Sequence, residues 1–326
     1  MKRIAFLLLM TGAAYGQIYV ESPTAGAITI TPHGLEGQQN GSQPYRGYNI
    51  ALGWKALENN LLAGSNIAIG YEALNSTSKG SNNIAIGFFA LKNNFQGYGN
   101  VAIGHNVLTN NGGMTNTAVG DGALRANAGA WSNVAMGAGA LGRSTAGGNN
   151  TSVGFNAGFN VKTGSNNLLL GYQADVSDTT LFNAAAIGAN TIVNASNKIR
   201  LGNDQVTVVE GPVAYSFPSD RRLKENIVYT SRLGLDFITR LQTVSYNYIS
   251  DKTRVRHDGF IAQDVEQVMK ALGVSFSGLK IAADGTYSLA YSDFVMPLVN
   301  AVKEQQEKIE RLEKQVESLL KTAQKP

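Results

Sequence analysis

A repeat of 17 residues constrains the fold of this 326-residue chain more than any other feature. Its clearest copies read N-[IV]-A-[ILMV]-G and begin at Asn49, Asn66, Asn83 and Asn100. The repeat glycines follow one another at steps of 17 residues, with one step of 16 and a last step of 14; they are residues 53, 70, 87, 104, 120, 137, 154, 171, 188 and 202. Ten copies in register predict a stack of similar structural units.

Each unit suits one coil of a β-solenoid. It offers a short apolar strand, a glycine where the backbone turns, and a polar stretch such as 75–82 that closes the coil. Asn and Gly tolerate the positive φ angles that tight turns require. One coil cannot bury its own apolar face, but a stack can. Small residues inside the strand, such as Ala68 and Ala85, indicate close packing near an axis. We therefore predict a mainly β array over residues 49–202.

The N-x-A-x-G motifs resemble the head repeats of trimeric adhesins, in which three chains form a left-handed β-roll. The period in that family is usually shorter, so the resemblance implies the architecture, a trimeric β-roll or solenoid, more than the detailed geometry.

The array shows no sign of catalysis. A glycosidase needs two carboxylates at a fixed separation, and the nine acidic residues of 17–218 do not recur in register with the repeat. Trp54 and Trp131 could stack on sugars, although an isolated aromatic residue on a solenoid more often packs. We predict a rigid stalk or head, with a surface glycan or another cell-surface ligand as its candidate partner.

Residues 1–16 are predicted to be a signal peptide. Lys2 and Arg3 precede a run of seven apolar residues, and Ala14-Tyr15-Gly16 has the small-x-small pattern of a cleavage site. The alternatives are a short membrane anchor or a buried N-terminal strand, but seven residues are too few to cross a bilayer core of about 30 Å. We expect a secreted or cell-surface protein whose mature chain does not insert into the membrane, with 17–48 as an N-terminal leader.

Composition excludes several function classes. The chain has no cysteine and only three scattered histidines, so we predict no metal site, thiol chemistry or cofactor. The net charge of +4 forms no basic stripe of the kind that nucleic-acid binding requires.

Ser219 and Lys224 form the strongest candidate catalytic pair, within the stretch S-D-R-R-L-K-E-N-I. A serine hydroxyl is a poor nucleophile unless a base takes its proton, and a desolvated lysine can be that base. The preceding linker, 203–218, is predicted to be extended β structure, and Pro218 favours an extended conformation at Phe217. The bond before Ser219 is thus presented for cleavage.

The C-terminal part resembles the peptidase S74 family through four motifs in the family's order. They are S-D-x-R-L-K-E-N-I from Ser219, V-x-Y-x-Y from Val244, G-F-I-A-Q-D-V-E from Gly259 and Y-S-L-A-Y-S-D-F-V from Tyr287. These domains are the intramolecular chaperones of phage tail spikes and endosialidases, and occur also in a membrane-bound transcription factor of animals.

The resemblance implies a single-turnover autoprotease. In that family three chains associate, the preceding β structure folds, and each chain cuts itself before the motif serine. Ser219 would be the nucleophile, Lys224 the general base and Pro218–Ser219 the cut bond; proline at 218 could slow the attack. Asp220, Arg222 and Gln263 are candidate supporting residues, although a salt bridge in a surface turn also explains the first two.

A closing helix supports association. Leu298, Val302, Gln305, Ile309, Leu312, Val316 and Leu319 follow a 4-3 spacing, which predicts a coiled coil over 298–326 after an α+β chaperone domain at 219–297. Branched a positions with Leu at d favour dimers in isolated peptides, but the array and the family both imply a homotrimer.

Three functions therefore remain open. The favoured one is a secreted fibre that trimerises through its chaperone domain and then cleaves itself. The alternatives are a permanent trimer clamp without cleavage, and an enzyme that acts on an external polysaccharide.

Overall fold

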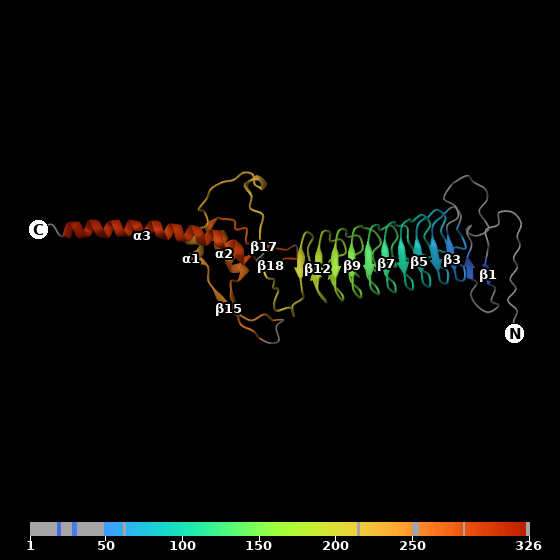
Figure 1. The fold of residues 1–326 in the computed structure, drawn as a ribbon. Helices are drawn as coiled ribbons and strands as arrows, with labels where there is room; N and C mark the ends of the chain where they lie inside the picture. Colours follow the sequence, from blue (N-terminus) through green and yellow to red (C-terminus); the bar gives the residue numbers. More distant parts are fainter. Residues whose placement is uncertain are drawn as a thin grey trace. The chain divides into compact units, whose positions relative to one another are not determined.

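The computed structural model describes residues 18–20, 28–30, 49–60, 63–213, 216–249, 254–282 and 284–323. It divides into two compact units, Met1–Asn203 and Asp204–Pro326. The predicted signal peptide lies outside the described residues, as does the leader except for two short strands, β1 (Ile18–Val20) and β2 (Ile28–Ile30). Figure 1 shows the two units and the order of their elements along the chain.

The first unit is a β-solenoid, as the repeat predicts. Its main sheet joins β1 and β2 to one strand from each coil, and from β3 onward neighbouring strands pair in parallel and in register (Figure 1). The coil strands are β3 (Ile50–Leu52), β4 (Ile67–Ile69), β5 (Ile84–Ile86), β6 (Val101–Ile103), β7 (Thr117–Val119), β8 (Val134–Met136), β9 (Thr151–Val153), β10 (Leu168–Leu170), β12 (Ala185–Ile187) and β14 (Ile199–Leu201). A second, two-stranded parallel sheet joins β11 (Asp175–Val176) to β13 (Ile192–Val193).

Each coil strand from β3 to β10 turns its middle residue inward and its two outer residues outward. The middle residues are mostly alanines, such as Ala68, Ala85 and Ala102, and they are fully buried and stacked on one another. Leucines four residues after the repeat glycine, such as Leu91 and Leu108, form a second buried row. A fully buried leucine contributes about 1.5–3 kcal/mol, so the stack supplies the burial that a single coil lacks.

The repeat glycine is required by both conformation and space. Gly87 has φ 132°, a conformation that L side chains rarely adopt, and a Cβ on it would collide with the carbonyl group of Gly104 in the next coil. The same relation links the successive repeat glycines from Gly53 to Gly188. The second residue after the glycine is left-handed, which suits the Gly or Asn found at 106, 122, 139 and 156.

A ladder of buried asparagines precedes the strands. Each Oδ1 accepts a hydrogen bond from the backbone N–H of the next asparagine in the ladder; for Asn83 and Asn100 the distance is 2.9 Å. Most of the Nδ2 groups donate to a backbone carbonyl about 14 residues further on, as from Asn100 to Gly113 at 3.1 Å. The ladder consists of Asn49, Asn66, Asn83, Asn100, Asn116, Asn133, Asn150 and Asn167.

The second unit is an α+β domain that ends in a long helix, in agreement with the predicted fold class. Its helices are α1 (Leu235–Arg240), α2 (Ala262–Leu272) and α3 (Val295–Ala323), with short 3-10 helices η1 (Arg221–Leu223) and η2 (Tyr291–Phe294). Two antiparallel hairpins complete it: β15 (Val244–Tyr246) with β16 (His257–Gly259), and β17 (Leu279–Ile281) with β18 (Tyr287–Leu289).

A small aromatic core holds this domain together. Phe237, Phe276 and Phe294 are buried. The ring centroid of Phe276 lies 5.4 Å from that of Phe237 and 4.6 Å from that of Phe294. The start of α3 is fixed by two hydrogen bonds: Leu235 N–H donates to Glu304 at 3.0 Å, and Asn300 donates to the Leu233 carbonyl at 3.2 Å. No helix in the described part of the chain is both long and apolar enough to span a bilayer.

The linker before Ser219 differs in one respect from the expected β structure. Its described residues, 203–213 and 216–218, form no paired strand and are almost all exposed. A strand needs a neighbour for its backbone hydrogen bonds, and no strand among the described residues pairs with this linker.

Removal of one ladder amide should destabilise the array strongly. Asn100→Ala leaves the Asn116 N–H without its acceptor and removes the bonds to Asn83 and Gly113. We expect a loss of about 3 kcal/mol, because an unsatisfied buried group costs about 1–3 kcal/mol and several bonds disappear together. Thermal unfolding measures the loss. The control Asn110→Ala, whose exposed partner is Asn93, should change little; equal effects would contradict a special role for the ladder.

Asp175 should make the array less stable as the pH rises. Its carboxyl is buried in the position that leucine occupies in earlier coils, and this desolvation raises its pKa from 3.8 to about 6, despite hydrogen bonds from the N–H groups of Val176 and Asn160. The folded state thus binds the Asp175 proton more tightly than the unfolded state does. The protonated carboxyl therefore stabilises the folded array fully below about pH 4, and this stabilisation is lost as the pH rises through 6.

Asp175→Asn should therefore raise the melting temperature at about pH 7.5 more than at about pH 4. Asp178 provides an opposite control, because hydrogen bonds from Thr180 lower the pKa of this exposed carboxyl. Asp178→Asn should cost stability only above the ordinary carboxyl pKa. A pH-independent effect of Asp175→Asn would refute the assignment.

Candidate functional site

One tight turn brings Ser219 and Lys224 together. Asp220, in extended conformation, caps η1 by accepting a hydrogen bond from the Arg222 N–H at 2.8 Å. The short helix ends at Leu223, and the N–H of its C-cap residue, Lys224, donates to the Arg221 carbonyl at 3.1 Å. This single turn reverses the chain, so that a residue five positions after the serine returns to it.

The Lys224 ammonium donates a hydrogen bond to the Ser219 hydroxyl oxygen at 2.7 Å. A nucleophile and its base need to lie within about 2.6–3.2 Å of each other for direct proton transfer. The distance is therefore short enough for the lysine, once neutral, to take the hydroxyl proton. The two candidate catalytic residues are the ones that the structure brings into contact.

Asp220 and Arg222 bind each other. The Arg222 guanidinium donates three side-chain bonds to the Asp220 carboxylate: Nε to both oxygens at 3.1 Å, and Nη2 to Oδ2 at 2.6 Å. This contact holds the pKa of the Asp220 carboxyl below its ordinary value. Asp220 is thus an ionised structural partner that shapes the turn, and the described contacts give neither residue a bond to Ser219 or Lys224.

Gln263 is not brought to the pair. It is an exposed residue in the first turn of α2, and no described hydrogen bond connects it to the turn at Ser219. The structure thus joins two of the five residues that the sequence singled out around the cleavage site, and pairs Asp220 and Arg222 with each other.

The site is exposed in the single chain. All described residues from 216 to 232 are exposed, including large apolar side chains: Phe217 at 76%, Leu223 at 71% and Val228 at 77%. A lysine becomes a useful base when desolvation disfavours its charged form. In the single chain, Ser219 and Lys224 are both exposed to water.

The tyrosines of the later motifs have structural contacts that their sequence pattern did not reveal. Tyr246 and Tyr248 share a hydrogen bond at 3.3 Å between their hydroxyls, and this contact raises the pKa of Tyr246 to about 12. The Tyr291 hydroxyl accepts the Phe260 N–H at 3.0 Å, which ties the start of α2 to η2. The alternation in V-x-Y-x-Y, which places Tyr246 and Tyr248 two residues apart on one face of an extended segment, was the sequence signal that could have indicated their contact.

Comparison with known proteins identifies this part of the chain. Residues 219–274 match the Peptidase S74 family model, whose description is chaperone of endosialidase. The match begins at Ser219 and includes Lys224, the β15–β16 hairpin and α2. No curated protein matches the chain. Residues 219–274 are therefore similar to the Peptidase S74 family, the chaperone of endosialidase.

Proposed function

We propose that this protein is a secreted, homotrimeric fibre whose C-terminal chaperone drives trimerisation and folding and then cuts the chain once, between Pro218 and Ser219. The observation that carries the proposal is the 2.7 Å hydrogen bond between the Lys224 ammonium and the Ser219 hydroxyl, at the first residue of the family match. The β-solenoid that precedes this site is the part that folds before the cut.

The proposed reaction begins when the Ser219 oxygen attacks the carbonyl carbon of Pro218 and Lys224 takes the hydroxyl proton. A C–O ester bond forms while the C–N bond between Pro218 and Ser219 breaks, and Lys224 returns the proton to the leaving Ser219 nitrogen. Water then hydrolyses the ester, which leaves a Pro218 carboxylate and restores the Ser219 hydroxyl.

Two exposed apolar surfaces support self-association. The strand face consists of the outward first and third residues of the coil strands, with Met136, Leu168 and Leu170 among the most exposed. The second surface is the heptad row of α3, where the apolar residues are 47–69% exposed: Leu298, Val302, Ile309, Leu312, Val316 and Leu319. Both surfaces continue along a whole element, as the contact faces of a parallel assembly would.

Association of three chains would also remove Ser219 and Lys224 from water, to which both are exposed in the single chain. The apolar residues around the site, such as Phe217 and Leu223, would be removed from water when three chains meet, and Lys224 with them. The local heptads of α3 can associate before the non-local solenoid forms, because local contacts form faster. The helix would thus set the register, and burial of the site would follow.

A trimer clamp without cleavage is the second candidate. Two observations favour it: proline stands on the acyl side of the bond to be cut, and both members of the pair are exposed in the single chain. It predicts the same trimer and differs only in the fate of the Pro218–Ser219 bond.

Intact mass under denaturing conditions tests the cleavage. We expect wild type to appear as two fragments split between Pro218 and Ser219, and Ser219→Ala and Lys224→Ala to remain whole. Arg221→Ala is the matched control, because this neighbouring cation makes no side-chain contact with the pair and should still allow the cut. Wild type that remains a whole chain in a trimer would reject the protease and leave the clamp.

Native mass tests the assembly. Leu312→Glu places a charge in the exposed heptad row and should shift the protein from trimer towards monomer, because a charge in an apolar seam is costly to desolvate. Lys314→Glu, on the outer side of the same helix, should leave the trimer intact. If cleavage follows association, Leu312→Glu should also slow the cut by about tenfold or more; an unchanged trimer would exclude this row as the contact.

A further inference from the structure

An exposed row of side chains runs along the solenoid directly after the repeat glycines. Several members are aromatic: Tyr71 stacks on Phe88 with ring centroids 4.9 Å apart, and Phe155 stacks on Tyr172 at 5.5 Å. After the repeat glycines from Gly53 to Gly171, the row consists of Trp54, Tyr71, Phe88, His105, Asp121, Ala138, Phe155 and Tyr172; Ala189 and Asn203 follow the last two glycines. None of these residues belongs to the strand face.

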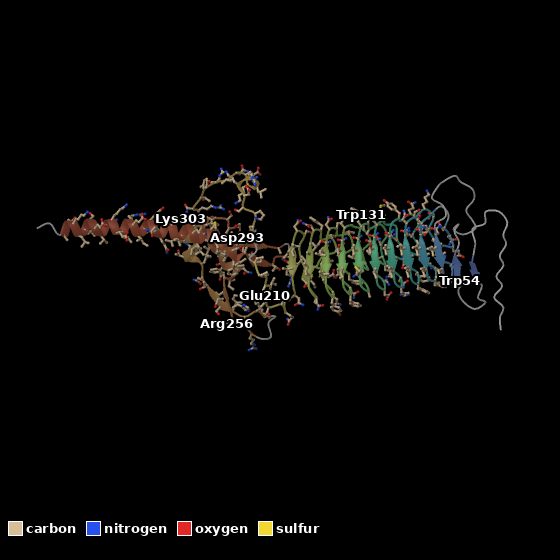
Figure 2. All side chains as sticks on the ribbon, viewed as in Figure 1. Trp54, Trp131, Glu210, Arg256, Asp293 and Lys303 are labelled. Atoms are coloured by element: carbon tan, nitrogen blue, oxygen red, sulfur yellow. The ribbon has the colours of Figure 1, made fainter. Side chains whose placement is uncertain are left out.

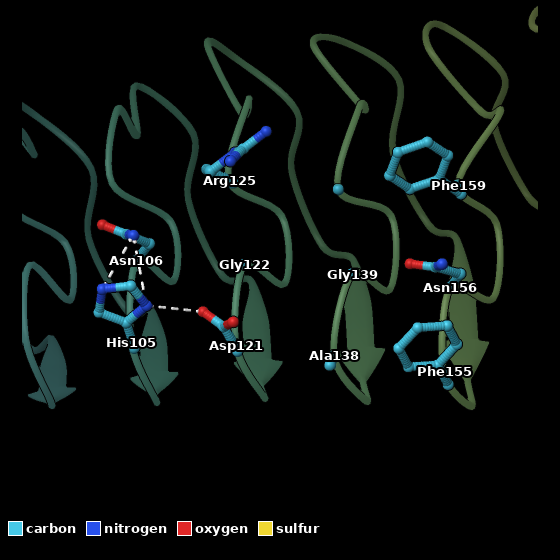
Figure 3. Close-up of a pocket in the computed structure, with 11 residues that line it drawn as sticks. His105, Asn106, Asp121, Gly122, Arg125, Ala138, Gly139, Phe155, Asn156 and Phe159 are labelled. Atoms are coloured by element: carbon cyan, nitrogen blue, oxygen red, sulfur yellow. Dashed lines mark hydrogen bonds and ion pairs between the residues drawn. The ribbon is translucent and has the colours of Figure 1, made fainter.

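Ala138 interrupts the row between Asp121 and Phe155, and this interruption forms a groove. Ala138, Gly139 and Gly142 leave this coil almost without side chains, between His105 and Asp121 on one side and Phe155 on the other (Figure 3). The cavity has a volume of about 390 Å³. Neighbouring coils lie about 4.8 Å apart, so the bare coil leaves roughly 10 Å between the coils on either side of it.

Aromatic rings line one side of the groove. Figure 3 shows the rings of Phe155 and Phe159 broadside, next to the bare coil. The exposed fraction of Phe155 is 48%, so its ring offers apolar surface to a ligand, whereas the Arg143 guanidinium lies over the Phe159 ring, 5.5 Å from its centroid. Trp131, by contrast, lies against Gly148, where an added Cβ would be 2.7 Å from the indole ring, and is partly used for packing. It lies on the outside of the coils, as does Trp54 (Figure 2).

Polar groups surround these rings. The Asp121 carboxylate bonds to His105 Nδ1 at 2.8 Å, and Asn156 points towards the bare coil (Figure 3). The Arg125 guanidinium also lines the groove and makes no hydrogen bond or ion pair with the residues that the structure describes. An arginine of this kind is suited to a planar carboxylate, which it can bind through two parallel bonds.

We propose that this groove binds one pyranose unit of an acidic oligosaccharide. The apolar C–H face of the sugar ring would lie on Phe155, its hydroxyls would bond to Asp121 and Asn156, and its carboxylate would pair with Arg125. Asp121 is the one carboxylate among the described lining residues, whereas hydrolysis needs two. The groove therefore binds a sugar without cutting it. This inference rests on the fibre function proposed above and names its ligand class.

Calorimetric titration of the full chain with two probes tests the proposal: a hexamer of uronic acid and a neutral hexamer of glucose. We expect the uronate to bind with a dissociation constant below about 1 mM and more tightly than the neutral probe. Ala138→Phe should weaken uronate binding at least about tenfold, because it fills the bare coil with the ring that Phe88 and Phe155 carry in the same position. Its melting temperature reports whether the array still folds.

Two further variants separate the contribution of the aromatic ring to binding from that of the arginine charge. Phe155→Ala should weaken both probes, whereas Arg125→Gln should weaken only the uronate. Phe88→Ala removes an aromatic ring from the same row outside the groove and should change neither. Failure of both probes to bind at about 1 mM, or unchanged uronate binding by a folded Ala138→Phe, would overturn the proposal. The titration is repeated with Ser219→Ala, so that a failure of cleavage or trimerisation is recorded separately from a failure of sugar binding.

Discussion

The buried asparagine ladder is the interaction on which the solenoid depends. Each amide satisfies the backbone N–H at the start of the next coil and usually a carbonyl where that coil closes, so one side chain replaces the hydrogen bonds that a turn would otherwise lose. Because the ladder joins adjacent coils in fixed register, the strands align residue for residue, and alanines and leucines meet their equivalents. The apolar core is thin, and the polar ladder provides the registration that it cannot.

Regular stacking also explains how a repetitive solenoid can carry a groove at one of its coils. Every coil presents the same positions to solvent, so a change of side chain in one coil alters the surface without altering the backbone. Replacement of the aromatic residue by Ala138, beside Gly139 and Gly142, creates the groove in this way. The C-terminal unit follows different principles: a small aromatic core fixes the base of α3, and the rest of the helix remains an apolar row exposed in the single chain.

Much of the fold and part of the site could be predicted from particular residues. The 17-residue period located the coils because identical units must stack, and the motif S-D-R-R-L-K-E-N-I indicated the pair that lies 2.7 Å apart. For Gln263, the motif position says nothing about distance from the turn at Ser219, and its supporting role stays a prediction. The aromatic row escaped notice because its members differ in type and are recognised as neighbours only when the coils are superposed.

The sequence by itself determined the period, the β-solenoid architecture, the family motif and the heptads, since these depend on spacing along one chain. Only the tertiary structure decided which side chains meet across coils: the registered amides, the desolvated Asp175 and the groove at Ala138. The physical reason is that a contact between coils joins residues about 17 positions apart through a backbone whose exact turn geometry sets the register. Spacing predicts that coils stack, whereas packing decides what each of them leaves exposed.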